Sequence, residues 1–142
     1  EAQYYGLTAE GTFKVHNSGQ SRFETPRTGI TGNAKCPDAT GHCYVTFFDA
    51  PWTAGPNYKI LDTDYENYSV VYECGDDGNP DFAYLWFLSR TPTVDQAQMD
   101  LYHQIAAEKV PNFDLASMAT PDRQDAGCKY ANSPSEFQYV LS

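Results

Sequence analysis

Short runs of alternating apolar and polar residues follow one another through the first 90 residues, with turn-forming clusters between them. They occupy residues 3–7, 12–17, 28–35, 43–48, 58–63, 68–74 and 82–90. Each run has the length and the β-branched and aromatic content of a strand. Strands joined by short turns at this spacing predict an antiparallel barrel or sandwich.

The period of the pattern changes after residue 93. Apolar residues then recur at helical spacing, namely Val94, Ala97, Leu101, Ile105 and Tyr102. Thr93 is a candidate N-cap and Pro111 ends the segment, so we expect a helix over 94–109 and an extended segment over 113–142. One such helix cannot cover both faces of a large sheet, whereas a barrel buries one face of every strand in its own interior. We therefore predict an all-β fold, an antiparallel up-and-down barrel with one α-helix packed outside, formed by residues 1–142 as a single domain.

Alternation along the strands assigns residues to the barrel interior. In the runs 12–17, 58–63 and 68–74 the polar residues mark the outer face, so the apolar residues that alternate with them point inward. These inward residues are Phe13, Val15, Tyr58, Ile60, Tyr68, Val70 and Tyr72. The interior is then broad, aromatic and dotted with hydroxyls, which suits a planar apolar ligand. The alternative is that the rings simply fill a small barrel. The candidate ligand-binding residues are Phe13, Val15, Tyr44, Phe48, Tyr58, Ile60, Tyr68, Tyr72, Tyr84, Trp86 and Leu88, with Trp52 at the mouth.

Composition narrows the classes of partner. The formal net charge is −10, and such a polyanion repels nucleic acid and anionic membranes. The sequence has no apolar run of the about 18–20 residues that a membrane-spanning helix needs. Aromatic residues make up 15% of the chain, which supports a strand-rich fold because flat rings pack well on a pleated surface.

The four cysteines form an even set without C-x-x-C spacing, which is typical of two disulfides in an oxidising compartment. Cys36 and Cys43 bracket a six-residue loop and are placed to bridge a hairpin. The triplet that begins at Asn67 is a glycosylation sequon in a predicted turn. Together these features favour a secreted protein.

No residue cluster has the pattern of an active site or a metal site. Asp62, Asp64 and Glu66 gather near one turn, but acids at this spacing are more often solvated charges than a hydrolytic pair. The acidic loop at 75–81 lacks the spaced glutamate of a calcium-binding loop. No nucleophile elbow, phosphate loop or dinucleotide fingerprint occurs. We expect a protein that is not an enzyme and that holds no metal.

Two stretches resemble motifs of the lipocalin family. "YKILDTDYENYSVVYEC" (58–74) is similar to the motif at the turn between strands F and G, where Thr63, Asp64 and Tyr65 stand, and "YLWFLSRTP" (84–92) is similar to the end of strand H, where Arg90 stands. The helix that follows fits the same family. The subgroup that matches best contains apolipoprotein D, crustacyanin and the bilin-binding proteins. The Gly-x-Trp motif of strand A is absent, so residues 3–90 correspond to strands B to H.

The resemblance has consequences for the disulfides. In that subgroup the cysteines matching Cys74 and Cys128 bond to partners that lie before strand A and strand B. Three alternatives stay open: an N-terminal segment is missing from this sequence, it is a separate cleaved chain linked through Cys74 and Cys128, or these two cysteines bond each other.

The resemblance also implies a ligand class. It suggests a bilin such as biliverdin or a carotenoid such as astaxanthin, with a lipid, retinoid or steroid as the alternative. A second alternative is a protein-interaction role, as a homo- or hetero-oligomer with no ligand.

Overall fold

Seven antiparallel strands form one sheet whose order in space is their order in the chain. The computed structural model describes residues 1–20, 28–74, 83–118, 124 and 128. The strands are β1 (Ala2–Tyr5), β2 (Thr12–Gly19), β3 (Thr28–Lys35), β4 (His42–Phe47), β5 (Tyr58–Thr63), β6 (Tyr68–Glu73) and β7 (Tyr84–Ser89). The helix α1 (Gln96–Lys109) and the short 3₁₀ helix η2 (Leu115–Ser117) follow.

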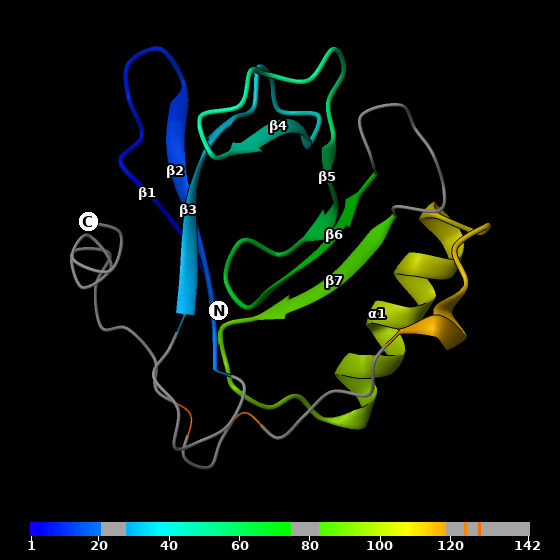
Figure 1. Cartoon of the computed structure of the whole chain (residues 1–142). Coiled ribbons are helices and arrows are strands. Elements are labelled where there is room, and N and C mark those ends of the chain that lie inside the picture. The colour runs from blue at the N-terminus through cyan, green and yellow to red at the C-terminus, as the bar shows by residue number, and fades with distance from the viewer. Residues whose placement is uncertain (21–27, 75–82, 119–123, 125–127, 129–142) are drawn as a thin grey trace.

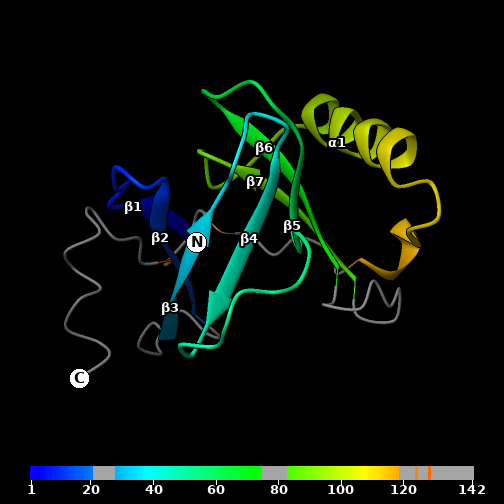
Figure 2. The same ribbon diagram turned by 90° about the horizontal axis from the view of Figure 1, so that it is seen from above.

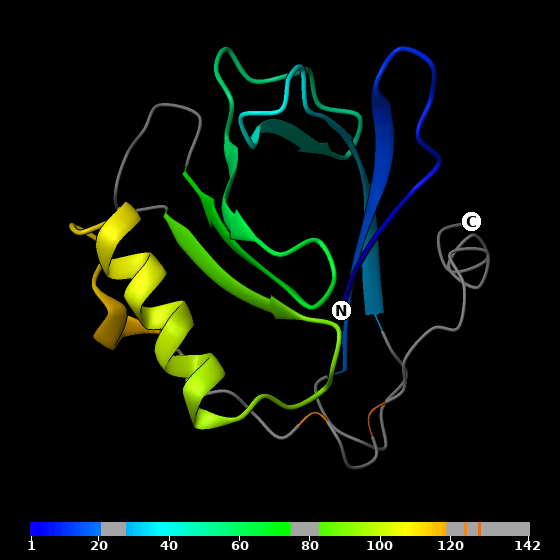
Figure 3. The same ribbon diagram turned by 180° about the vertical axis from the view of Figure 1, so that it is seen from behind.

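The sheet curls so that β1–β3 stand opposite β5–β7, with β4 between the two groups (Figures 1 and 2). α1 lies outside the curl, against β5, β6 and β7 (Figure 3). The predicted all-β fold with one external helix is therefore confirmed. Within the described residues the sheet is a half-barrel whose two edges are β1 and β7.

A large apolar core fills the space between α1 and the outer face of the sheet. Its buried members are Val70, Leu85, Tyr102, Ile105 and Ala106. Tyr102 is central, because its ring centroid lies 5.3 Å from those of both Tyr68 and Phe87. Burial of this many side chains makes the helix-covered side a major source of folding stability.

The helix differs from the sequence prediction at its start and in its buried face. It begins at Gln96 rather than Val94, because the Asp95 carboxylate accepts a hydrogen bond of 2.8 Å from the backbone amide of Gln98 and so provides the N-cap. The predicted N-cap, Thr93, lies outside the helix. Its carbonyl instead accepts a hydrogen bond from the Thr91 hydroxyl.

The buried stripe of the helix is Tyr102, Ile105 and Ala106, whereas Leu101, expected to be buried, is 38% exposed. After the helix, the segment predicted to be extended includes η2, and most of 119–142 lies outside the described residues. No helix in the described ranges is long and apolar enough to cross a membrane.

A smaller core lies on the concave face of the sheet. Val15, Ala34 and Val45 are buried there, with Phe13, Phe47 and Tyr58 packed against them. Gly32 makes this packing possible, because a Cβ at this position would lie 2.5 Å from the Thr46 carbonyl oxygen and 2.7 Å from the Phe47 ring. The ring of Phe47 thus occupies the space that a side chain at position 32 would fill.

Candidate functional site: the concave face of the sheet

Five aromatic residues form a connected series across the concave face, which we call the aromatic belt: Tyr84, Trp86, Tyr58, Tyr4 and Phe13. The rings of Tyr84 and Trp86 stack at 5.7 Å between centroids and 7° between planes. Tyr58 stacks on Trp86 at 6.4 Å and 28°. Tyr4 contacts Phe13 edge-on at 6.3 Å and 64°. The belt therefore presents flat apolar surface from β7 and β5 to β1 and β2.

The hydroxyls of Tyr4 and Tyr58 join the two halves of the belt by a hydrogen bond of 2.7 Å. β1 and β5 are not neighbours in the sheet, so this bond spans the concave side rather than a strand ladder. Burial raises the pKa of both tyrosines, most strongly that of Tyr58. Both hydroxyls therefore stay neutral at physiological pH and keep their hydrogens.

Glu73 is the charged neighbour of the belt. In the strand register it lies directly opposite Tyr58 on β5 and Tyr84 on β7. Residues directly opposite each other in antiparallel strands share a face, so the Glu73 carboxylate lies on the concave side between these two tyrosines. After burial and the neighbouring Tyr4, the negative charge of Glu73 is a further cause of the raised pKa of Tyr58.

The structure brings together seven of the twelve predicted ligand-binding residues. Packing contacts and the strand register place Phe13, Val15, Tyr58, Ile60, Tyr84, Trp86 and Leu88 on the concave face. Their binding role remains a prediction. The other five lie elsewhere, for two different reasons.

Tyr68 and Tyr72, expected to point inward with Val70, point outward instead. Tyr68 packs against Tyr102 of α1, and Tyr72 contacts Phe113 edge-on at 6.3 Å. The prediction assumed that the polar residues of this strand, Ser69 and Glu73, face solvent outside the barrel. The face of β6 under α1 must be apolar, so the polar residues of this strand stand on the concave side.

Tyr44 and Phe48 were assigned one residue out of register. In β4 it is Val45 that packs on the concave face, so Tyr44 points outward, where the Lys35 ammonium lies 4.9 Å from its ring centroid. Phe48 follows the strand, with a left-handed φ of 57° and 88% exposure. Trp52 also contacts Lys35, at 4.6 Å, rather than the concave face.

Residues of the concave face that the sequence prediction missed include Tyr4, Val45, Phe47, Val71 and Glu73. Val45 and Phe47 alternate with Tyr44, so an error of one residue in this strand exchanges the two sets of side chains. Tyr4 sits between Gln3 and Tyr5 in a short strand, where alternation does not separate two tyrosines. Glu73 was read as exterior because it is charged.

The turn at Thr63, Asp64 and Tyr65 is built by side-chain to backbone hydrogen bonds. The Asp64 carboxylate accepts from the backbone amides of Glu66, Asn67 and Tyr68 at 3.0, 2.7 and 3.1 Å. These bonds, led by those from Asn67, hold the pKa of Asp64 well below its usual range. The acid therefore acts as a turn former.

Neighbouring groups complete this turn. The hydroxyl of Thr63 donates to the Tyr68 carbonyl at 2.6 Å, and Tyr65 takes a left-handed φ of 65°. The backbone amide of Arg90 donates to the Asn67 carbonyl at 2.9 Å, which ties the end of β7 to the turn. Glycosylation of Asn67 stays a prediction; its side-chain amide donates to Asp64 at 2.7 Å.

Cys36 and Cys43 form a disulfide across the hairpin between β3 and β4. The expected bridge across this loop is therefore confirmed. Cys74, which follows β6 directly, carries a thiol that is partly buried. Cys74 and Cys128 therefore do not bond each other in the structure, which was one of the three alternatives.

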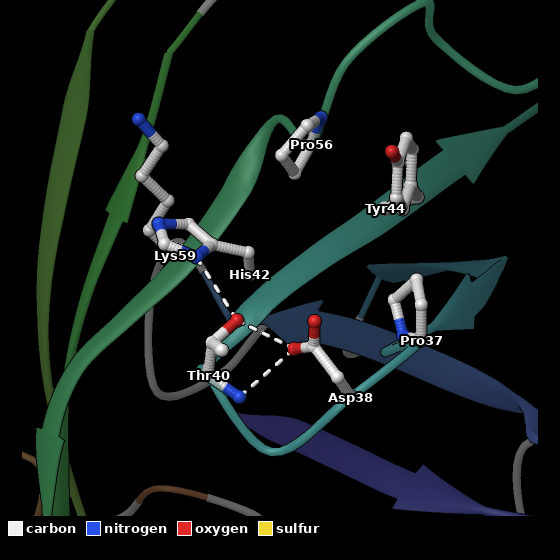
Figure 4. Close-up of a pocket in the computed structure, with 7 residues that line it drawn as sticks. All are labelled: Pro37, Asp38, Thr40, His42, Tyr44, Pro56 and Lys59. Atoms are coloured by element: carbon white, nitrogen blue, oxygen red, sulfur yellow. Dashed lines mark hydrogen bonds between the residues drawn. The ribbon is translucent and has the colours of Figure 1, made fainter.

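A separate pocket of about 380 Å³ lies on the outer side of β4 and β5 (Figure 4). It is lined by Pro37, Asp38, Thr40, His42, Tyr44, Pro56 and Lys59. Asp38 accepts a hydrogen bond of 2.9 Å from the Thr40 backbone amide, and the Thr40 hydroxyl lies 3.1 Å from Nδ1 of His42. The hydroxyl and amide of Thr40 lower the pKa of Asp38. These groups bond one another to shape the hairpin. Among the described residues no group of three or more His, Cys, Asp or Glu could hold a metal ion.

Comparison with known proteins places the chain in a family. A family model described as a lipocalin-like domain matches residues 1–123. Outer membrane lipoprotein Blc of Vibrio cholerae is 31% identical over 110 residues, which cover 74% of this chain and 58% of Blc. Purpurin of Gallus gallus is 29% identical over 135 residues, which cover 87% of this chain and 67% of purpurin. The chain thus spans less than two thirds of the length of Blc.

Solved structures share the fold at lower sequence identity. Lobster apocrustacyanin A1 has a TM-score of 0.60 and 17% identity, with 95% of this chain and 68% of that chain covered. Apocrustacyanin C1 has a TM-score of 0.61 and 18% identity, with 99% and 71% covered. Since the family model matches most of the sequence and the curled sheet with its external helix has the fold of these structures, the chain belongs to the lipocalin family.

Proposed function

We propose that the protein binds and carries a hydrophobic small molecule against its concave face. The observation that carries this proposal is the aromatic belt, which supplies stacked rings on one side of the concavity, an edge-on pair on the other and two neutral hydroxyls between them. Burying apolar ligand surface there contributes about 25 cal/mol per Å², offset by the cost of ordering the ligand. Flat stacked rings favour a planar, conjugated molecule.

A pigment is the leading ligand class within this proposal. The motifs around Asp64 and Arg90 resemble a lipocalin subgroup for which a carotenoid such as astaxanthin or a bilin such as biliverdin is expected. A lipid, retinoid or steroid is the near alternative. Membership of the lipocalin family supports a carrier rather than an enzyme.

A protein-interaction role is the second candidate, and one observation favours it. Phe48 is 88% exposed at the end of β4, and an exposed ring of this kind is a natural anchor for a partner. Sedimentation or light scattering of the purified protein separates this role from carriage. A defined oligomer with no uptake of carotenoid, bilin, retinoid or fatty acid would support the interaction role and contradict carriage.

The test of carriage compares the two tryptophans. We expect Trp86→Leu to weaken binding of an added carotenoid or retinoid about 2- to 12-fold, because a stacked ring contributes about 0.5–1.5 kcal/mol beyond the area that it buries. Trp52→Leu is the matched control, since Trp52 contacts Lys35 on the outer side of the sheet. Binding is followed by absorbance of the ligand. Equal effects of both changes would contradict a binding site on the concave face.

The proposal also includes secretion of the protein and a further segment linked to it by disulfides. The Cys36–Cys43 disulfide is consistent with secretion into an oxidising compartment. A further segment disulfide-linked through Cys74 and Cys128 is the arrangement that the lipocalin resemblance implies. Intact mass under reducing and non-reducing conditions tests it. Loss of the mass of a peptide on reduction supports a linked segment, and a mass that changes only by the hydrogens gained contradicts it.

A further inference from the structure

The pocket on the outer side of β4 and β5 has one wall that is held firmly in place. The hairpin that forms this wall is closed by the Cys36–Cys43 disulfide. The Gly41 carbonyl of the hairpin accepts a hydrogen bond of 2.8 Å from the Ile60 backbone amide. A Cβ at position 41 would lie 2.7 Å from the Ile60 carbonyl oxygen, so only glycine permits this close approach. The hairpin is therefore fixed against β5.

A buried asparagine fixes the opposite wall, which the loop before β5 provides. The Asn57 side chain donates a hydrogen bond to the Val45 carbonyl at 3.0 Å and accepts one from the Val45 amide at 2.9 Å. These two bonds, just beyond the paired residues of β4 and β5, hold the preceding Pro56 beside the pocket. A pocket with walls held in this way loses little conformational entropy when a ligand binds.

The Asp38 carboxylate provides a hydrogen-bond acceptor at this pocket. Both hydrogen bonds that it accepts from described residues come from Thr40, one from the amide and one from the hydroxyl, and both reach Oδ1. Figure 4 shows the second oxygen, Oδ2, directed away from Thr40. The lone pairs of Oδ2 are therefore available to a hydroxyl group of a ligand.

Donors and flat apolar surfaces surround this acceptor. His42 and Lys59 lie opposite each other in the register of β4 and β5, and both line the pocket. Their nitrogens can donate hydrogen bonds to ligand oxygens. The tyrosine ring and the two proline rings of the lining, Tyr44, Pro37 and Pro56, offer apolar surface against which the C–H groups of a ligand can pack.

Charges of both signs at the pocket disfavour a ligand that carries a net charge. An organic cation would meet Lys59, and the Lys35 ammonium already lies 4.9 Å from the centroid of the Tyr44 ring that would attract it. An anion would meet the Asp38 carboxylate. A neutral polyol gives up less hydration than either ion, and its hydroxyls both donate to a carboxylate and accept from a lysine or an imidazole.

We propose that this outer pocket binds one neutral sugar residue, whose ring packs against Tyr44 and whose hydroxyls donate to Asp38. His42 and Lys59 are the donors to its oxygens. The pocket volume of about 380 Å³ lies near the lower end of the range for small-molecule sites, which suits a ligand of this size. The pocket is on the outer side of the sheet, so this proposal does not depend on carriage against the concave face.

The first experiment titrates the unmodified protein with sugars that share a ring skeleton and differ in charge. Glucose and galactose are compared with their cationic 2-amino forms and with their anionic uronic acids, and backbone amide shifts are followed by NMR. We expect the neutral sugars to shift amides within 38–44 and 57–59, with a Kd on the order of 1–10 mM for so small a ligand. The charged sugars should bind about 2- to 5-fold more weakly, since exposed charges contribute little.

Three outcomes of this titration would decide the proposal. No shift at about ten times that Kd, or shifts confined to residues of the concave face, overturns the site. Equal or tighter binding of the charged sugars, or of alanine as a zwitterion, overturns the preference for a neutral polyol. With binding confirmed, an equal affinity for the methyl glycoside assigns the site to the terminal residue of a glycan, and a lost affinity assigns it to a free sugar.

Variants assign the binding to residues. Asp38→Asn keeps an oxygen for the bonds from Thr40 and replaces Oδ2 by an amide donor, so it should weaken sugar binding about 2- to 12-fold. Tyr44→Leu removes the ring and should have an effect of similar size. Asp49→Asn is the matched control, because Asp49 follows β4 outside the pocket lining. Circular dichroism verifies that each variant is folded. Losses in folded variants no larger than that of Asp49→Asn overturn the assignment.

Discussion

Both faces of β6 and β7 carry apolar residues, yet the aromatic rings at the ends of the concave face are less completely buried than the residues under α1. On the outer face Val70 and Leu85 are 0% and 6% exposed under α1. On the concave face Tyr84, which stacks on Trp86, is 56% exposed. Rings that are fully covered stabilise the fold, whereas ordered rings that stay exposed are available for a ligand. In the proposed function, the side to which each residue of these strands points thus decides whether it mainly stabilises the fold or contacts the ligand.

The β1–β4 half of the sheet offers a second contrast. It has no helix over it among the described elements, and its core cluster is the small group around Val15, Ala34 and Val45. The Cys36–Cys43 disulfide lies in this half. The sheet is therefore stabilised in two different ways: by a disulfide in the β1–β4 half and by packing of α1 on the other half.

The largest effect on stability should come from the outer core. Tyr102→Ala removes a ring that contacts both Tyr68 and Phe87, and we expect it to lower the free energy of unfolding by about 3–5 kcal/mol. Urea denaturation followed by circular dichroism measures it. Tyr84→Ala on the concave face is the control and should cost much less. Equal losses for the two variants would contradict the separation of the faces.

Removal of the disulfide should have the next largest effect. The double change Cys36→Ser and Cys43→Ser releases a loop with a sequence separation of seven. The loss of this constraint on the unfolded chain costs about 2–3 kcal/mol in the loop-entropy model. Hydrogen exchange should show faster local opening in β3 and β4 than in β6 and β7. Uniform acceleration over all strands would show instead that the two halves of the sheet open together.

The smallest effect should be the pH dependence contributed by the turn that precedes β6. The pKa of Asp64 is lowered in the folded state, so its contribution is present above the unfolded pKa of about 3.9 and is lost as the pH falls through the folded value. We expect Asp64→Asn to lower the melting temperature at pH 6 and to have a smaller effect at pH 3. Glu66→Gln, the neighbouring acid, is the control. A deficit that does not change with pH would argue against this role of the carboxylate.

Local patterns in the sequence predict most of the fold. Turn residues and alternation locate the strands, and the change of period after residue 93 locates the helix. The start of that helix depends on Asp95, whose carboxylate takes the capping position that the sequence also offers at Thr93. Both Thr and Asp are good N-cap residues, so the sequence alone does not choose between the two positions.

The site was predicted less well, because alternation alone does not say which face of a strand is inside. In β6 both faces carry apolar residues, and the position of α1 decides that Tyr68 and Tyr72 turn outward. In β4 a shift of one residue exchanges Tyr44 for Val45. Tyr58 and Trp86 were placed correctly because their strands have an unambiguous polar neighbour or a helix on the opposite side.

Gly32 and Phe47 have a consequence for how this lipocalin can diverge. The ring fills the space over the glycine, and any side chain at position 32 would collide with that ring or with the Thr46 carbonyl. A smaller residue at 47 would remove the contact with the ring but not the contact with the Thr46 carbonyl, which belongs to the backbone. Across relatives we therefore expect glycine to persist at position 32 while the residue at 47 varies, so that the shape of the concavity changes through β4 rather than through β3.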